Sequence, residues 1–234
     1  MTQLFFSDYD IESANEAVLP LVIFGAGGLG REVLLLLQQL NDTHLTWDVR
    51  GFYDDQAPAT ATVAGLRYLG TAADLNATPA SEPLAVAVAV GSPTGRARVV
   101  AQLTAAHLRF PVLVHPRVHL APQQRITLGA GSIIQQGCLL TCDIAIGRFV
   151  LLNLGCTLGH DAVLEDFCSL MPHANVSGAT HLEAGVYLGT SASVIQDVRI
   201  GAHAVVGAGA VVVRDLPANV TAVGVPARTI KSDD

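Results

Sequence analysis

The sequence predicts a small α/β domain followed by a parallel β-helix built from six-residue repeats. From Ile126 to Asp215 the third residue of every six is Leu, Ile or Val, through fifteen consecutive hexads without an insertion. Before these repeats, short apolar strands alternate with helical patterns, and a glycine-rich turn follows the first strand. Such alternation is typical of a parallel sheet covered by helices.

The six-residue period has a direct structural meaning. In an extended chain alternate side chains share a face, so positions one and three of each hexad point inward together before the chain turns. Three hexads form the three sides of one triangular coil, so the fifteen hexads make five coils. A helical period cannot hold this phase over such a length. At position four, where we expect the turn and a left-handed backbone, six hexads carry glycine: Gly129, Gly147, Gly159, Gly189, Gly201 and Gly207.

The four cysteines follow the same period. Cys138, Cys156 and Cys168 stand at position one, and Cys142 stands at a corner. Position one is a place for small buried residues, so we predict that none of the four forms a disulfide or binds a metal.

The residues before the repeats contain a phosphate-binding pattern. We expect strands at 21–24, 47–53 and 84–90 and helices at 31–40 and 93–108. Gly25, Gly27 and Gly30 lie between the first strand and the first helix with the spacing of the dinucleotide fingerprint, and Asp54 and Asp55 follow about 24 residues later. By itself this motif allows a nicotinamide cofactor, another nucleotide, or a tight turn without a ligand.

These patterns divide the chain into five segments. We expect an N-terminal extension at 1–18, a Rossmann-like domain at 19–110, a connector at 111–125, the β-helix at 126–215 and a C-terminal tail at 216–234.

Composition narrows the classes of partner. Of the 234 residues, 50% are hydrophobic and 14% are charged, which excludes a disordered chain. The formal net charge is −7 and there is no basic run, so we expect neither nucleic acid nor an anionic membrane surface as a partner. No apolar stretch reaches the roughly 20 residues that span a bilayer. The start of the chain lacks the features of a signal peptide, so we expect a cytoplasmic protein.

Together the two halves resemble a bacterial family of hexapeptide-repeat sugar acetyltransferases. This family includes sialic-acid O-acetyltransferases, nucleotide-amino-sugar N-acetyltransferases and perosamine N-acetyltransferase. The resemblance covers about residues 19–230, and it implies a left-handed β-helix and acetyl transfer from acetyl-CoA in glycan biosynthesis. The matching segments are 22–32, Asp54-Asp55, His115-Pro116, Asn153, Gly159-His160-Asp161 and 223–228.

The resemblance implies roles for particular residues. His160 would be the general base, Asp161 would orient its ring, and Asn153 would help to place the reacting acyl group. The nucleotide of the sugar substrate, rather than a redox cofactor, would bind at Gly27, Gly28, Leu29, Asp54 and Asp55. Members of the family often carry His where Leu29 stands, so the identity of the nucleotide stays open.

Acetyl-CoA and subunit assembly are implied in the same way. The family's acetyl-CoA groove lies between neighbouring subunits, and matching positions here are Ser169, Gly189, Thr190, Gly207, Ala208 and Arg228. Ser169 stands where some relatives have a second His. A homotrimer is the usual state of the family, and we expect Phe149, Leu152 and Leu154 to face solvent and support it.

Several functions remain open at this point. N-acetylation of a nucleotide-linked amino sugar is the leading hypothesis, and O-acetylation of sialic acid or a related sugar is the alternative. A non-catalytic β-helix scaffold is the alternative from another class. A metal-dependent prism of the carbonic-anhydrase kind would need several converging histidines, but the coil spacing is unequal among His160, His173, His181 and His203. The sequence states neither the sugar nor the nucleotide, and we predict no metal cofactor.

Overall fold

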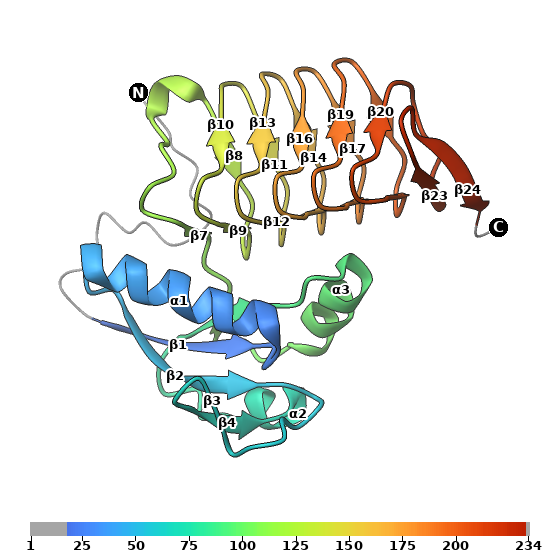
Figure 1. Cartoon of the computed structure of the whole chain (residues 1–234). Coiled ribbons are helices and arrows are strands. Elements are labelled where there is room, and N and C mark those ends of the chain that lie inside the picture. The colour runs from blue at the N-terminus through green and yellow to red at the C-terminus, as the bar shows by residue number, and fades with distance from the viewer. Residues whose placement is uncertain (1–17, 233–234) are drawn as a thin grey trace. The chain divides into compact units, whose positions relative to one another are not determined.

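The computed structural model describes residues 18–232, and these form two compact units that divide between Leu113 and Val114. One unit is an α/β domain, and the other is a stack of very short strands (Figure 1). The expected extension at 1–18 lies outside the described residues except for Val18. Within the described range no helix is long and apolar enough to cross a bilayer.

The α/β unit is built on a six-stranded sheet with the order β3-β4-β2-β1-β5-β6. All neighbouring strands are parallel except β3 and β4. The strands are β1 (Leu19–Phe24), β2 (Trp47–Tyr53), β3 (Thr62–Val63), β4 (Leu66–Gly70), β5 (Leu84–Val88) and β6 (Leu108–Arg109). The helices are α1 (Gly28–Thr43), α2 (Ala72–Asn76) and α3 (Pro93–Gln102).

The central position of β1 follows from its sequence and determines where a ligand can bind. Residues 21–24 are apolar on both faces of the strand and are at most 2% exposed. Because β2 and β5 flank β1 on opposite sides, the strand order reverses at β1. Open parallel sheets bind ligands at the carboxyl end of such a strand, and the glycine-rich segment follows there. Helix α3 ends at Gln102, earlier than the pattern predicted, because Leu108 returns to the sheet opposite Leu84.

The second unit stacks fifteen two-residue strands into three parallel sheets, as the hexads predicted. Each strand pairs with the strand three further along the chain, so partners such as Leu152 and Leu170 lie three hexads apart. Figure 1 shows the successive coils, coloured from green to red. The strands are β8 (Thr127–Leu128), β9 (Ile133–Ile134), β10 (Leu139–Leu140), β11 (Ala145–Ile146), β12 (Leu151–Leu152), β13 (Thr157–Leu158), β14 (Val163–Leu164), β15 (Ser169–Leu170), β16 (Asn175–Val176), β17 (His181–Leu182), β18 (Tyr187–Leu188), β19 (Ser193–Val194), β20 (Arg199–Ile200), β21 (Val205–Val206) and β22 (Val211–Val212).

The interior of the coils is the one that the repeat predicted. All fifteen third-position side chains are at most 7% exposed, and all first-position side chains except that of Ile126 are buried. Cys138, Cys156 and Cys168 belong to this interior, and all four cysteines are free. A column of aliphatic side chains therefore runs through the whole stack.

The expectation that Phe149 and Leu152 face solvent is wrong. Leu152 is a third-position residue with no exposed surface, because its side chain points into the coil. Phe149 is 1% exposed and stacks on Phe167, with ring centroids 5.4 Å apart. Of the three residues expected at the surface, only Leu154, at 41% exposed, presents its side chain to solvent.

The corners differ from the prediction in one respect. The left-handed backbone occurs at position six, where every residue from 131 to 209 has a positive φ, including Asp143, Asp161 and His173. Glycine at position four serves close packing instead. A Cβ on Gly159 would lie 2.5 Å from the backbone nitrogen of Gly178 on the next coil, so a side chain does not fit there.

Short elements close both ends of the stack. Before the first coil, β7 (Leu113–Val114) extends one sheet, and a 3₁₀ helix, η2 (Pro122–Gln124), precedes β8. After Asp215, β23 (Val220–Val223) and β24 (Arg228–Ser232) continue the same sheet, where the sequence indicated only a tail. Thr221 pairs with Val205, which is two positions short of the three-hexad interval, so the hexad phase is lost although pairing continues.

Candidate active site

The structure places His160 and Asp161 together on an exposed edge of the β-helix. They follow β13 at the corner that leads to β14. His160 Nδ1 lies 2.8 Å from Asp161 Oδ2, and the two side chains are 65% and 62% exposed. With the carboxylate accepting the Nδ1 hydrogen, the lone pair of the ring lies on Nε2. This is the form of histidine that can accept a proton from a substrate.

A glycine on the next coil provides the surface on which the His160 ring lies. A Cβ on Gly178 would lie 2.6 Å from both Cε1 and Nε2 of His160. Gly178 is not among the residues with a positive φ, so its backbone conformation does not require glycine. Glycine is needed at this position because a side chain would collide with the His160 ring. Sequence reasoning missed it, although Gly178 stands one full coil after His160.

The two preceding coils bring three further polar groups to the same edge. Asp161 donates its backbone N–H to the carbonyl of Cys142 at 3.2 Å. Arg125 binds both carboxylate oxygens of Asp143, and this holds the pKa of Asp143 below its usual range. Partial burial, together with the Asp143 carboxylate, raises the pKa of the Cys142 thiol, which disfavours a thiolate there.

Asn153 lies on a different edge from His160. It follows β12, and β13 separates the two corners, so one chain holds them at opposite ends of one side of the coil. Its side chain is 8% exposed, and its Oδ1 accepts the N–H of Leu154 at 2.7 Å. A single chain therefore does not bring Asn153 to the His160 ring.

Most of the predicted acetyl-CoA residues share the edge of Asn153. Gly189 and Gly207 stand two and three coils after Asn153, and Thr190 and Ala208 are exposed beside them. Arg228 is exposed at the start of β24. By contrast Ser169 has no exposed surface. The edge is lined by small residues and backbone groups.

In the α/β unit the glycine-rich segment separates into two pairs with different roles. A Cβ on Gly30 would overlap the carbonyl of Gly25, and Gly25 itself has φ of +118°, so the turn requires both glycines. A Cβ on Gly27 or Gly28 would meet no atom within 4 Å. Gly27 is the N-cap of α1 and offers no side-chain cap. The open pair and the helix N-terminus therefore form a surface suited to a phosphate.

The acidic pair after β2 holds the surrounding loops. Asp54 Oδ2 accepts the backbone N–H of Ala26 at 2.8 Å, and its Oδ1 accepts that of Gln56 at 2.9 Å. Asp55 Oδ1 accepts the N–H of Ala72 at the start of α2, at 2.9 Å. Asp54 thus fixes the glycine-rich loop directly, a role that the sequence analysis did not assign to it.

The remaining histidines do not converge. The rings of His173 and His203 lie against the backbones of Gly155 and Gly185, and His181 Nε2 lies 2.7 Å from Glu165. Among the described residues no three His, Cys, Asp or Glu side chains gather as a metal site would require.

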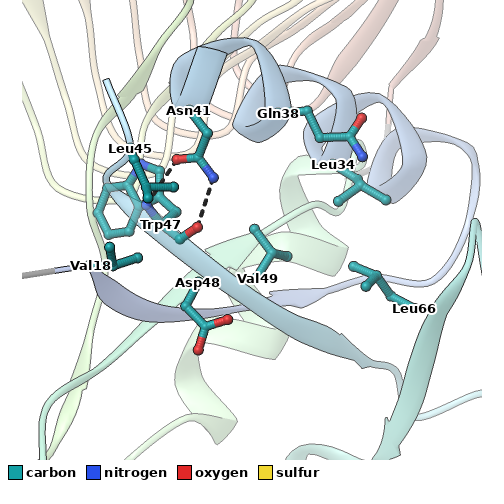
Figure 2. Close-up of a pocket in the computed structure, with 9 residues that line it drawn as sticks. All are labelled: Val18, Leu34, Gln38, Asn41, Leu45, Trp47, Asp48, Val49 and Leu66. Carbon is teal, nitrogen blue, oxygen red and sulfur yellow. Dashed lines mark hydrogen bonds between the residues drawn. The ribbon is translucent and has the colours of Figure 1, made fainter. Parts of the chain in front are cut away.

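Figure 2 shows a hollow of about 510 Å³ in the α/β unit. Val18 and Trp47 in its lining stand where β1 and β2 begin, whereas the glycine-rich loop follows the end of β1. Asn41 closes one end, because its side chain binds the backbone N–H and carbonyl of Trp47 at 2.9 and 2.7 Å. Since ligands of open parallel sheets bind at the carboxyl ends of the strands, this hollow is not the predicted nucleotide site. Its lining comprises Val18, Leu34, Gln38, Asn41, Leu45, Trp47, Asp48, Val49 and Leu66.

Comparison with known proteins matches both units. Residues 20–103 match the family described as the PglD N-terminal domain. GDP-perosamine N-acetyltransferase of Escherichia coli O157:H7 is 30% identical over 215 residues, which cover 89% of this chain and 95% of that protein. The chain belongs to the hexapeptide-repeat sugar acetyltransferase family.

Solved structures of family members agree with this assignment. PerB from Caulobacter crescentus, in complex with CoA and GDP-perosamine, has a TM-score of 0.81 at 30% identity and covers 93% of this chain and 100% of its own. The acetyltransferase domain of PglB from Neisseria gonorrhoeae, in complex with acetyl coenzyme A, has a TM-score of 0.82 at 29% identity, with 92% and 100% covered. The predicted fold class, an α/β domain followed by a left-handed parallel β-helix, is confirmed, and the chain is an acyltransferase.

Two of the residues to which the resemblance assigns ligand contacts differ in their surroundings. Leu29 lies in the first turn of α1, and Ser169 is buried in β15. The individual residue roles implied by the resemblance stay predictions.

Proposed function

We propose that this acetyltransferase moves an acetyl group from acetyl-CoA to the amino group of a nucleotide-linked amino sugar, with His160 as general base. The observation that carries the proposal is the exposed His160–Asp161 pair, with Nε2 directed away from its carboxylate partner. The PerB structure, which holds CoA and GDP-perosamine, supports the same pair of substrates here. The product would be an acetylated nucleotide sugar for glycan biosynthesis, and we expect the enzyme to act in the cytoplasm.

The chemistry needs no covalent enzyme intermediate. The neutral amine of the sugar attacks the thioester carbonyl, and His160 Nε2 takes the proton that the nitrogen loses. The tetrahedral intermediate then collapses and the carbon–sulfur bond breaks. The CoA sulfur takes the proton from the protonated His160 ring and leaves as the thiol, which returns the base to its neutral form. The chain's cysteines offer no competing nucleophile at this edge. Cys138, Cys156 and Cys168 are buried inside the coil, and burial together with the Asp143 carboxylate raises the pKa of Cys142.

The nucleotide would bind in the α/β unit. We expect Gly27, Gly28 and the N-terminus of α1 to hold its phosphates, because the loop is open there and no side chain caps the helix. Leu29 would contact the same nucleotide through its apolar side chain, while Asp54 keeps the loop in shape. Asp55 keeps one carboxylate oxygen outside its hydrogen bond to Ala72 and would face the base or ribose.

Acetyl-CoA would bind across a subunit boundary, and this is the reason for proposing a homotrimer. One edge of the β-helix carries most of the residues implied for acetyl-CoA, and His160 lies on the next edge. The residues on the first edge are Asn153, Gly189, Thr190, Gly207 and Ala208. Contacts that close around a threefold axis place one edge of each subunit beside a different edge of its neighbour. Arg228 would then be available for a phosphate of CoA, whereas the buried Ser169 contributes no surface.

The test is turnover with acetyl-CoA and GDP-perosamine, followed through release of the CoA thiol, with His160→Ala compared to wild type. We expect kcat to fall by about 10²–10⁴, the usual cost of losing a general base. His203→Ala is the matched control, since His203 is an exposed corner residue after β20, on the third edge of the β-helix. Near-wild-type turnover by His160→Ala would refute the assignment of the base. Acetylation of a sugar hydroxyl but not of an amine would replace the proposed substrate with the O-acetylation alternative.

A further inference from the structure

Below the His160–Asp161 pair, one edge of the β-helix carries a column of charged residues at intervals of one coil. Arg125, Asp143 and Asp161 occupy equivalent positions on successive coils and have nearly the same left-handed backbone, with φ of +51°, +58° and +58°. Arg125 therefore occupies the corner position of a coil that precedes the first hexad. The next residue of the column after Asp161 is Ala179, which carries no charge.

Arg125 is fixed in this column by the 3₁₀ helix η2. Gln124 donates from Nε2 to the carbonyls of Leu140 and Thr141 at 2.7 and 2.9 Å. The backbone N–H of Asp143 in turn donates to the carbonyl of Gln124 at 2.7 Å. With its backbone anchored, Arg125 donates from Nε and Nη2 to the two carboxylate oxygens of Asp143. A two-point contact of this kind fixes direction as well as distance.

The charged and titratable groups around the His160 ring come almost entirely from this side. Asp161 lies on its own coil, Cys142 and Asp143 lie on the coil before, and Arg125 lies one coil earlier still. On the following coil Gly178 and Ala179 carry no charge, and the next acid, Asp197, is two coils away. The pKa of Asp143 is lowered chiefly by Arg125, and the Cys142 thiol and the His160 ring also contribute to the lowering.

A general base must be neutral to accept a proton, so the charges near His160 affect its ability to act. An uncompensated carboxylate on the coil below would favour the protonated imidazole, and it would repel the carboxylate of Asp161. Arg125 supplies the opposite charge at the far side of Asp143. The net charge below the ring is then close to zero, and Asp161 is the carboxylate that acts on it.

We propose that the Arg125–Asp143 ion pair positions the catalytic base electrostatically, by cancelling the charge of the carboxylate stacked beneath His160 and Asp161. This rests on the proposed function for its link to catalysis, but the effect on the ring belongs to the protein alone. Neither residue touches a substrate in this proposal, so both are positioning residues.

The experiment is a titration of the His160 ring by NMR, in wild type and in the variants Arg125→Gln, Asp143→Asn and the double variant, with the signal assigned by its loss in His160→Gln. Arg125→Gln leaves Asp143 uncompensated and should raise the midpoint of the ring titration. Asp143→Asn leaves Arg125 uncompensated and should lower it. We expect shifts of about 0.3–0.8 pH unit in opposite directions at low salt, smaller in 1 M KCl because the groups are exposed.

Two further variants make the result decisive. The double variant should return the midpoint to within about 0.2 pH unit of wild type, since both charges are then absent. Arg125→Lys keeps the charge but loses the two-point contact, and it should shift the midpoint less than Arg125→Gln. If Asp143→Asn fails to fold, the two Arg125 variants still decide the sign. Shifts of both single variants in the same direction, or no shift in either, would overturn the proposal.

The acid limb of log kcat/KM against pH should move with the ring midpoint in each variant. Failure of the proposed function can be told apart from failure of this inference, because the NMR titration needs no substrate. If His160→Ala retained turnover while the opposite shifts of the ring were still observed, the base assignment would fall and the ion pair would remain as an electrostatic neighbour of His160.

Discussion

The two units of this chain build their sites in different ways. In the β-helix the backbone repeats with every coil, and His160, Asp161 and Asp143 are corner side chains added to an unchanged scaffold. In the α/β unit the site is a single irregular loop, where glycines that form the turn alternate with glycines that leave space for a ligand. Changes at a β-helix corner should therefore affect chemistry, and changes in the loop should affect folding or binding according to which glycine is replaced.

The largest effect is expected when the same substitution is made inside the coil rather than on its surface. Leu152→Asp places a carboxylate without a partner inside the coil and should cost about 3–5 kcal/mol of folding free energy or more, enough to abolish a cooperative thermal transition. Leu154→Asp, two residues away and 41% exposed, is the matched control and should keep the fold. Circular dichroism and thermal melting measure both. Light scattering of Leu154→Asp then tests the proposed trimer, which we expect this variant to weaken.

The second comparison separates the two pairs of glycines in the loop. Gly30→Ala pushes a methyl group into the carbonyl of Gly25 and should destabilise the α/β unit by about 2–4 kcal/mol. Gly28→Ala meets no protein atom, so its melting temperature should stay within about 2 °C of wild type while KM for the nucleotide sugar rises about tenfold. Equal stability losses in the two variants would show that the loop is not divided as described.

The third prediction tests a corner of the β-helix without changing a polar group. Gly178→Ala has an unstrained backbone but places a methyl group where the His160 ring lies, so the ring must move. We expect kcat to fall about 10–100-fold, because displacement of a base from its working position costs rate steeply. Gln196→Ala, at the equivalent position of the next coil, should leave kcat within about twofold of wild type. A fully active Gly178→Ala enzyme would mean that catalysis does not require the His160 ring to pack on Gly178.

The smallest expected effect concerns the residue that holds the loop. Asp54→Ala removes the acceptor of the Ala26 and Gln56 N–H groups, each hydrogen bond being worth about 1 kcal/mol. KM for the nucleotide sugar should rise about 3–10-fold with kcat unchanged, and Asp54→Asn, which keeps an acceptor oxygen, should restore most of the affinity. A loss of kcat with unchanged KM would instead place Asp54 at the reacting groups.

Much of this architecture could be predicted from the sequence. The period of six identifies the buried third-position residues, the number of coils and the interior cysteines, because alternation along an extended chain determines which side chains share a face. The glycine fingerprint locates the phosphate-binding turn for a similar reason, since a strand, a tight turn and a helix follow one another locally. His160 and Asp161 are adjacent in the chain, so their pairing also needs no distant contact.

Contacts between coils were decided only by the tertiary structure. Three contacts join residues that are one full coil apart. They are the packing of His160 on Gly178, the ion pair of Arg125 with Asp143, and the stacking of Phe149 on Phe167. Whether such neighbours touch depends on the conformation of the corner, and the left-handed residue stands at position six rather than at the position where glycine is most frequent. A repeat determines the direction of each side chain, whereas the distance between side chains on successive coils is determined by how the corners stack.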